Sequence, residues 1–254
     1  MDLELRDKTV VITGASSGLG LATALSAASE GASLILNSRD AQRLTTAAQD
    51  AEAAGATLVK TVTGSLGEAH TATDIVQAAM DATGRLDAVA ISIGGPPAGP
   101  DGSISDEQWH EAFTTVFMGM RRMARTAAQV MGPGGSIVLV LSSTVRVPIA
   151  GIATSNGLRP GLAVLAKQMS VEFGPQGIRV NCVLPGRFDT ARVRSLDAVH
   201  DDPQAARAQQ EALIPLGRYG RPIEFGDFVT FVLSSKASYL TGTAIALDGG
   251  ASPV

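Results

Sequence analysis

The chain alternates short apolar runs with segments of helical pattern along its whole length. The runs are rich in β-branched residues and are expected to be strands. Helical patterns occupy 21–31, 41–55, 69–84, 105–131 and 161–174; the apolar runs occupy 9–13, 33–37, 57–62, 86–92, 136–141, 178–184 and 243–248. Continuous apolar strands joined by helices indicate a parallel sheet covered on both faces. The pattern therefore predicts an α/β fold, a doubly wound parallel sheet of about seven strands, in a single domain over residues 1–254.

Composition is consistent with one globular core. Of 254 residues, 45% are hydrophobic and 17% are charged, and no linker, repeat or low-complexity tract divides the chain. The net charge of −4 argues against a general affinity for nucleic acid or an anionic membrane, since both favour a concentrated basic surface. We expect neither partner, and we predict no metal site.

The cysteine content and the first residues bear on the cellular compartment of the protein. Cys182, the single cysteine, lies in the apolar run RVNCVLPG, where we expect a buried thiol and no disulfide. The opening MDLELRDK is not patterned as a secretory signal, and no apolar run approaches the ~20 residues of a membrane-spanning helix. We expect a cytoplasmic protein.

A glycine-rich turn, TGASSGLG, follows the first predicted strand and leads directly into a helix. Gly14 permits a tight turn, Gly18 lets the backbone approach a pyrophosphate, and Gly20 allows close packing of the helix. The N–H groups at the start of that helix would face the anion. This context favours a dinucleotide site over a glycine turn that binds nothing. The predicted cofactor contacts here are Gly14, Ser16, Ser17, Gly18, Leu19 and Gly20.

The spacing T-G-x-x-x-G-x-G resembles the short-chain dehydrogenase/reductase family. LDAVAISIGG, GGSIVLVLSS and RVNCVLPGRFDT are similar to family segments, and the C-terminal region from IPLGRYGRP to LDGG resembles the ketoacyl-carrier-protein reductase branch. The resemblance covers nearly the whole chain. It implies a Rossmann-like fold, a nicotinamide cofactor, a small-molecule substrate and a homodimer or homotetramer.

The end of the second predicted strand bears on the choice of cofactor. An acidic residue there would bind the adenosine ribose of NAD, whereas this chain has Ser38 followed by Arg39. A guanidinium suits a phosphate dianion, so NADP(H) is favoured over NAD(H), although Arg39 as a solvated surface charge is the alternative. Asp40 is expected to cap the next helix. By resemblance, Gly94, Pro185, Gly186 and Thr190 also belong to the cofactor site.

The resemblance implies a catalytic serine, tyrosine, lysine and asparagine, and only the serine is in place. Counting from Ser142, the tyrosine position holds Ser155, the lysine position holds Arg159, and the asparagine position holds Val116. Tyr219 and Tyr239 are each followed four residues later by a residue other than lysine. Ser142, Ser155 and Arg159 are therefore the predicted catalytic residues, and Arg159 is also expected to contact the cofactor.

These replacements leave two functions open. Arginine stays protonated and is a poor acid, but it can bind ribose, an anionic substrate or an oxyanion. The sequence favours an oxidoreductase that reduces a carbonyl or an activated double bond slowly or with an unusual proton source. The alternative is a catalytically silent NADP(H)-binding sensor or oligomer partner.

Three further interpretations concern the surroundings of this site. Ser155 and Asn156 can be explained as N-cap residues of a helix. Arg146, Arg187 and Arg194 are expected near the mouth of the site, either as scattered surface charge or as a hint of an anionic ligand. The polar segment 187–216 is predicted to be a mobile substrate lid with a short helix.

Overall fold

A computed structural model describes residues 1–198 and 202–252. Within these residues one sheet contains seven parallel strands in the order β3-β2-β1-β4-β5-β6-β7. The strands are β1 (Thr9–Thr13), β2 (Ser33–Ser38), β3 (Leu58–Thr63), β4 (Ala88–Ile91), β5 (Ser136–Val140), β6 (Arg179–Pro185) and β7 (Ala244–Leu247). The predicted Rossmann-like, doubly wound sheet is confirmed, with strand ends within about two residues of those expected.

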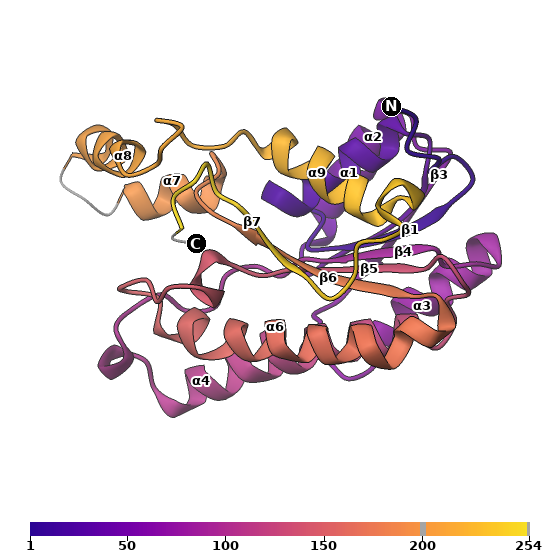
Figure 1. The fold of residues 1–254 in the computed structure, drawn as a ribbon, viewed down its shortest axis with the longest axis horizontal. Helices are drawn as coiled ribbons and strands as arrows, with labels where there is room; N and C mark the ends of the chain where they lie inside the picture. Colours follow the sequence, from indigo (N-terminus) through magenta and orange to yellow (C-terminus); the bar gives the residue numbers. More distant parts are fainter. Residues whose placement is uncertain (199–201, 253–254) are drawn as a thin grey trace.

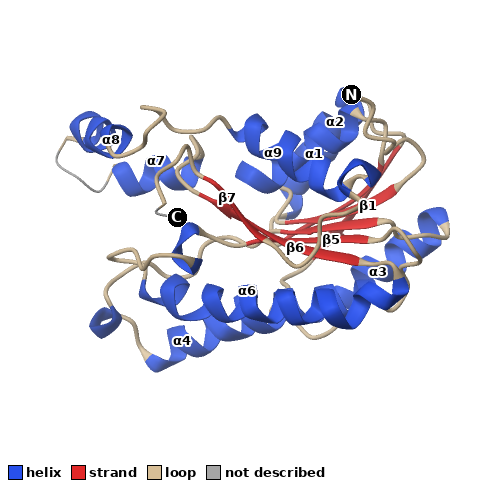
Figure 2. Ribbon diagram, in the orientation of Figure 1, coloured by secondary structure: helices blue, strands red, loops and turns tan. Residues whose placement is uncertain are grey.

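Helices cover both faces of this sheet, as Figures 1 and 2 show. The helices are α1 (Gly18–Ser29), α2 (Ala41–Ala54), α3 (Thr71–Thr83), α4 (Asp106–Ala112), α5 (Gly119–Ala128), α6 (Ala153–Phe173), α7 (Ala191–Asp197), α8 (Pro203–Ala212) and α9 (Pro222–Leu233). One core packs α1, α2 and α9 against the sheet, and a second core on the other face packs α3, α5 and α6. None of the helices in the described ranges is both long and apolar enough to cross a bilayer.

The strand order reverses between β1 and β4, which is where ligands bind in folds of this kind. The loops after these two strands are joined directly. Thr13 Oγ1 donates to the carbonyl oxygen of Ser92 at 2.7 Å, and the backbone N–H of Ser92 donates back to Thr13 Oγ1 at 3.0 Å. We call the ends of β1, β4, β5 and β6, with the loops that follow them, the carboxyl edge.

The helix predicted at 105–131 differs from a regular α-helix. A π-helical segment, Phe113–Met118, separates α4 from α5, and Val116 is buried within it. Segments of this type are rare and occur frequently at functional sites.

The helix predicted at 161–174 begins earlier than expected. α6 starts at Ala153, where Thr154 Oγ1 donates to the Pro97 carbonyl at 2.8 Å. The N-cap interpretation of Ser155 and Asn156 is therefore wrong, since both lie inside the first turn. Asn156 instead bonds through its side chain to the backbone N–H and carbonyl of Ile149.

Glycines on α6 admit large aromatic rings from the helices beside it. A Cβ atom on Gly157 would lie 2.8 Å from the ring of Trp109 in α4, and one on Gly161 would lie 3.2 Å from the ring of Phe117. The helix that carries Ser155 and Arg159 is therefore held at short range by aromatic side chains.

The predicted lid, 187–216, contains two helices, α7 and α8, where one short helix was expected. Residues 199–201 of the lid lie outside the described part of the chain. Asp197 of α7 is buried and accepts hydrogen bonds from Arg187 Nη1 at 3.0 Å and from the Tyr219 hydroxyl at 3.1 and 3.2 Å. This cluster joins α7 to the first residue of the lid and to the segment that follows the lid.

Candidate active site

The glycine turn between β1 and α1 has the conformation that its sequence predicts. Gly14 and Gly18 have φ angles of +61° and +56°, which L-residues with side chains rarely adopt. A Cβ on Gly20 would overlap the carbonyl group of Gly14, so the third glycine is required by packing.

The same turn exposes the start of α1. Ser17 is its N-cap residue but makes no side-chain cap bond, and no acidic residue lies in the first turn. The N–H groups of Gly18, Leu19 and Gly20 have no partner within the helix, as in any helix N-terminus. Ser16 and Leu19 are half-buried beside them. The turn therefore presents backbone donors and a positive helix end to the carboxyl edge.

Ser38, Arg39 and Gly94 are brought together at one end of this edge. Ser38 ends β2, is buried, and pairs through its hydroxyl with the backbone of Asp40. Arg39 is exposed and extends toward the loop after β4, where a Cβ on Gly94 would lie 3.9 Å from Arg39 Nη2. Asp40 caps α2, as expected, by accepting from the N–H of Arg43.

The loop after β6 faces the glycine turn. Pro185 ends β6, and a Cβ on Gly186 would lie 2.6 Å from Asp248 Cβ, so this glycine is needed for packing against the end of β7. Thr190 is the N-cap of α7, and its Cγ2 atom would lie 3.7 Å from a Cβ on Gly18. The glycine turn and the start of the lid are therefore neighbours.

The predicted catalytic residues lie on β5 and α6. Ser142 follows β5, is half-buried, and accepts a hydrogen bond from the N–H of Thr144 at 3.2 Å. Ser155 is buried on α6, and its carbonyl accepts a long bond of 3.5 Å from Thr144 Oγ1. Thr144 thus links the two serines.

Arg159 has an unusual environment for a charged residue. Its side chain is only 6% exposed, and Nη1 donates to the carbonyls of Val140 and Leu141 at 3.1 and 2.6 Å. Its Nε atom is buried and has no hydrogen-bond partner among the described residues. Burial of the guanidinium and the nearby charge of Arg192 lower the pKa of Arg159 to about 10. A buried charge of this kind is costly unless something compensates it.

Arg192 was not predicted from the sequence. It lies in the first turn of α7 and reaches the loop after β4, where its Nη2 atom donates to the Pro96 carbonyl at 3.4 Å. A Cβ on Gly95 would lie 3.1 Å from the same nitrogen. The signal that could have found it is its position two residues after Thr190, on a segment already assigned to the lid.

The three arginines that the sequence places near the mouth of the site do not share one environment. Arg187 pairs with Asp197, Arg194 pairs with Asp189 at 2.8 Å, and Arg146 is exposed. The Tyr219 hydroxyl is engaged by Asp197, and burial raises the pKa of Tyr219. Neither Tyr219 nor the ion-paired Arg187 and Arg194 is therefore free to serve the carboxyl edge in this conformation.

Comparison with known proteins decides the family. A family model described as Enoyl-(Acyl carrier protein) reductase matches residues 14–252. The chain belongs to the short-chain dehydrogenase/reductase (SDR) family. A rabbit relative, "Dehydrogenase/reductase SDR family member 4", is 30% identical, with 97% of this chain and 94% of the relative covered. The "3beta-hydroxysteroid dehydrogenase 1" of Eggerthella lenta is 34% identical, with 97% and 94% covered.

A solved SDR structure supports the same assignment. L-Sorbose reductase from Gluconobacter frateurii, complexed with NADPH and L-sorbose, superposes with a TM-score of 0.92 at 26% identity, and all of both chains is covered. The expected family, oxidoreductase class and fold are thus confirmed, and the fold is one that binds NAD(P).

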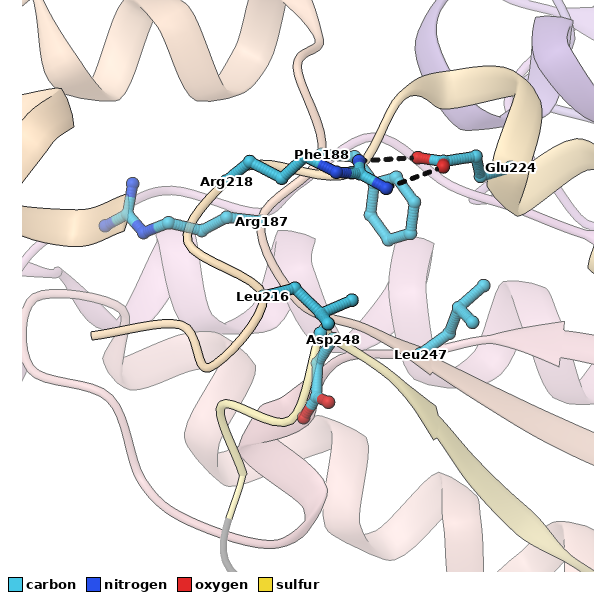
Figure 3. A pocket seen from close by; sticks show the side chains of 9 residues that line it. Arg187, Phe188, Leu216, Arg218, Glu224, Leu247 and Asp248 are labelled. Carbon is cyan, nitrogen blue, oxygen red and sulfur yellow. Dashed lines mark hydrogen bonds and ion pairs between the residues drawn. The ribbon is translucent and has the colours of Figure 1, made fainter. Parts of the chain in front are cut away.

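A separate hollow of about 160 Å³ lies in this SDR beyond the ends of β6 and β7 (Figure 3). Its lining comes from both ends of the lid, the first turn of α9 and the end of β7, and includes Phe188, Leu216, Arg218, Glu224 and Asp248. Arg218 and Glu224 form a two-bond ion pair there. None of the predicted cofactor residues lines this hollow.

Proposed function

We propose that this SDR is an NADP(H)-dependent oxidoreductase that reduces a carbonyl or an activated carbon–carbon double bond, with Ser142, Ser155 and Arg159 at its active site. The observation that carries the proposal is the position of Arg159. Its guanidinium is buried beside the end of β5, on the edge where the glycine turn offers its donors, and its Nε has no partner in the described structure.

The residues at the carboxyl edge fit a dinucleotide. The glycine turn leaves room where side chains would intrude, and the uncapped start of α1 offers N–H groups to a pyrophosphate. On this proposal Gly14, Ser16, Ser17, Gly18, Leu19 and Gly20 hold the diphosphate, Gly94 lies toward the adenosine end beside Arg39, and Pro185, Gly186 and Thr190 surround the nicotinamide end.

NADP(H) is proposed over NAD(H) because of Ser38 and Arg39. Ser38 brings no carboxylate that would repel a 2′-phosphate, and the exposed guanidinium of Arg39 is positioned across from Gly94 at the same end of the edge. The NADPH in the L-sorbose reductase structure is consistent with this choice.

When bound, the nicotinamide supplies a hydride to an electrophilic carbon of the substrate. The displaced electron pair would then reside on the carbonyl oxygen when a carbonyl is reduced. For an enone, the pair displaced onto the α-carbon would be delocalised into the adjacent carbonyl, so the negative charge would again lie mainly on an oxygen. Arg159 stabilises this developing negative charge, because a guanidinium in a site of low dielectric interacts strongly with an oxyanion. Ser142 donates a second hydrogen bond, and water delivers the proton, since an arginine with a pKa of about 10 remains charged at neutral pH.

An assay of NADPH oxidation tests this function. Protein and NADPH are mixed with a panel of ketones, enones and imines, and cofactor absorbance is followed; turnover that Arg159→Met abolishes supports the proposal. Binding affinity for NADPH is measured separately by calorimetry.

The second candidate is a catalytically silent NADP(H)-binding protein. It is favoured by the absence of a Tyr-x3-Lys pair anywhere in the sequence. Tight NADPH binding, no turnover on the panel and a gain of activity in a Ser155→Tyr, Arg159→Lys double variant would establish it.

We also propose a homodimer or homotetramer, and a lid at 187–216 that admits the substrate. SDR proteins are commonly oligomeric, and α6 carries two exposed valines seven residues apart, Val164 and Val171. Sedimentation velocity measures the mass in solution.

A further inference from the structure

Two arginines place their guanidinium groups at the carboxyl edge, and neither has an ion-pair partner in the described structure. Arg159 reaches the end of β5 from α6, and Arg192 reaches the loop after β4 from α7. β4 and β5 are neighbouring strands, and the charge of Arg192 is close enough to lower the pKa of Arg159. No carboxylate in the described part of the chain forms an ion pair with either guanidinium.

The neighbouring arginines of the lid, unlike Arg159 and Arg192, all have carboxylate partners. Arg187 and Arg194 belong to the same lid, and each is paired with an aspartate, Asp197 and Asp189 respectively. Arg207 of α8 is paired with Asp189 and Glu211. The lid therefore supplies carboxylates to these three arginines, while Arg192 turns toward the carboxyl edge.

The bonds that Arg159 and Arg192 do make leave capacity for a ligand. Arg192 donates one long bond of 3.4 Å to a carbonyl, which is easily exchanged. Arg159 uses Nη1 for two carbonyls and leaves a buried Nε without a partner. Each missing bond to a buried polar group is costly, and more so for a charged group.

The two possible occupants differ in charge. Ribose hydroxyls of a cofactor would give Nε a partner, but they are neutral and would not compensate the buried charge of Arg159. An oxyanion would satisfy the free donors and compensate both charges, and guanidinium groups bind carboxylate and phosphate with paired hydrogen bonds.

We propose that Arg159 and Arg192 form a receptor for an oxyanion, a carboxylate or a phosphate ester, carried by the substrate. The proposal rests on the proposed function and narrows its substrate class to carbonyl or activated-alkene compounds that carry such a group, for example 2-oxo acids and enoic acids. Because Arg192 belongs to α7, binding of the anion also positions the lid.

Calorimetry with a matched set of probes tests the receptor. Benzoate, phenyl phosphate and the neutral isostere benzamide are titrated into the full chain, with and without NADP⁺. A charged hydrogen bond corresponds to about a tenfold or larger change in affinity, so we expect at least one of the anions to bind about tenfold or more tightly than benzamide. The relative affinities of benzoate and phenyl phosphate identify which oxyanion the site prefers.

Variants on α7 provide the control. Arg192→Gln is expected to remove the preference for the anion, and the variant should fold because Arg192 is exposed. Arg194→Gln, two residues further along α7 and already paired with Asp189, should leave the preference unchanged.

Three outcomes would overturn the proposal: equal affinity for the anions and benzamide, no binding of either anion up to its solubility limit, or an Arg192→Gln variant that loses NADPH affinity while keeping the anion preference. The NADPH titration separates this proposal from the proposed function. A wild-type protein that binds benzoate as described but no NADPH would refute the function and leave the anion receptor standing.

Discussion

Replacement of Arg39 by glutamine should weaken binding of NADPH much more than binding of NADH. Arg39 is exposed, with Nη2 3.9 Å from where a Cβ on Gly94 would lie, and the described residues give it no ion-pair partner. Its charge is therefore available to a 2′-phosphate. A hydrogen bond to a charged group contributes about 1.5–3 kcal/mol, which corresponds to about 10- to 150-fold in affinity.

The lower end of that range applies here because Arg39 is open to solvent. Salt screens exposed charges over about 8–10 Å near physiological ionic strength, so we expect a loss of about tenfold for NADPH and less than about twofold for NADH. The difference should shrink further when the ionic strength is raised.

The assay is a calorimetric titration of both cofactors into the wild type, Arg39→Gln and a control, Arg43→Gln. Arg43 lies one turn later on the same surface and is paired with Asp40 at 3.4 Å. Equal losses for NADPH and NADH in Arg39→Gln, or an equal effect of Arg43→Gln, would refute the assignment of Arg39 to the phosphate.

Two further predictions concern stability. Gly20→Ala should lower the free energy of unfolding in urea by about 3 kcal/mol, because its Cβ would overlap the backbone of Gly14. Gly18→Ala meets no atom within 3.4 Å and should lower it by only about 1 kcal/mol, because of the left-handed backbone at this position. Similar values for the two variants would contradict this explanation. Hydrogen bonds from Arg218 and the Arg221 backbone lower the pKa of Glu224 from 4.5 to about 2, so its contribution to stability is present above pH 4.5 and is lost as the pH falls toward 2. Glu224→Gln should therefore have a lower free energy of unfolding than the wild type at pH 7. Urea unfolding at a series of pH values should show this difference narrowing between pH 4.5 and 2. A difference that stays constant with pH would disprove the link between Glu224 ionisation and stability.

The strands and the glycine turn could be predicted because their signals are local. A buried parallel strand requires a continuous apolar run, and the positive φ angles of Gly14 and Gly18 require glycine. The start of α6 could not be predicted in the same way. Ser155 and Asn156 have the composition of N-cap residues, but the helix is fixed by a bond from Thr154 to Pro97, which is 57 residues away in the chain.

The partners of the arginines likewise could not be predicted from local sequence signals. Pairing of Arg187 with Asp197 and of Arg194 with Asp189 joins residues ten and five apart, neither of which is a helical spacing. The role of Arg192 depends on the loop after β4, which is distant in sequence, so its position two residues after Thr190 does not by itself reveal that role. Its position in the sequence made Arg159 a candidate site residue, whereas the ion pairs of Arg187 and Arg194 and the position of Arg192 depend on tertiary contacts.

The contact between Trp109 and Gly157 gives this protein an intrinsic optical reporter. The chain has one tryptophan, and its indole lies against the turn of α6 between Ser155 and Arg159. A ligand that shifts this turn of α6 would change the surroundings of the indole, and the emission of a single fluorophore would register the event without a label.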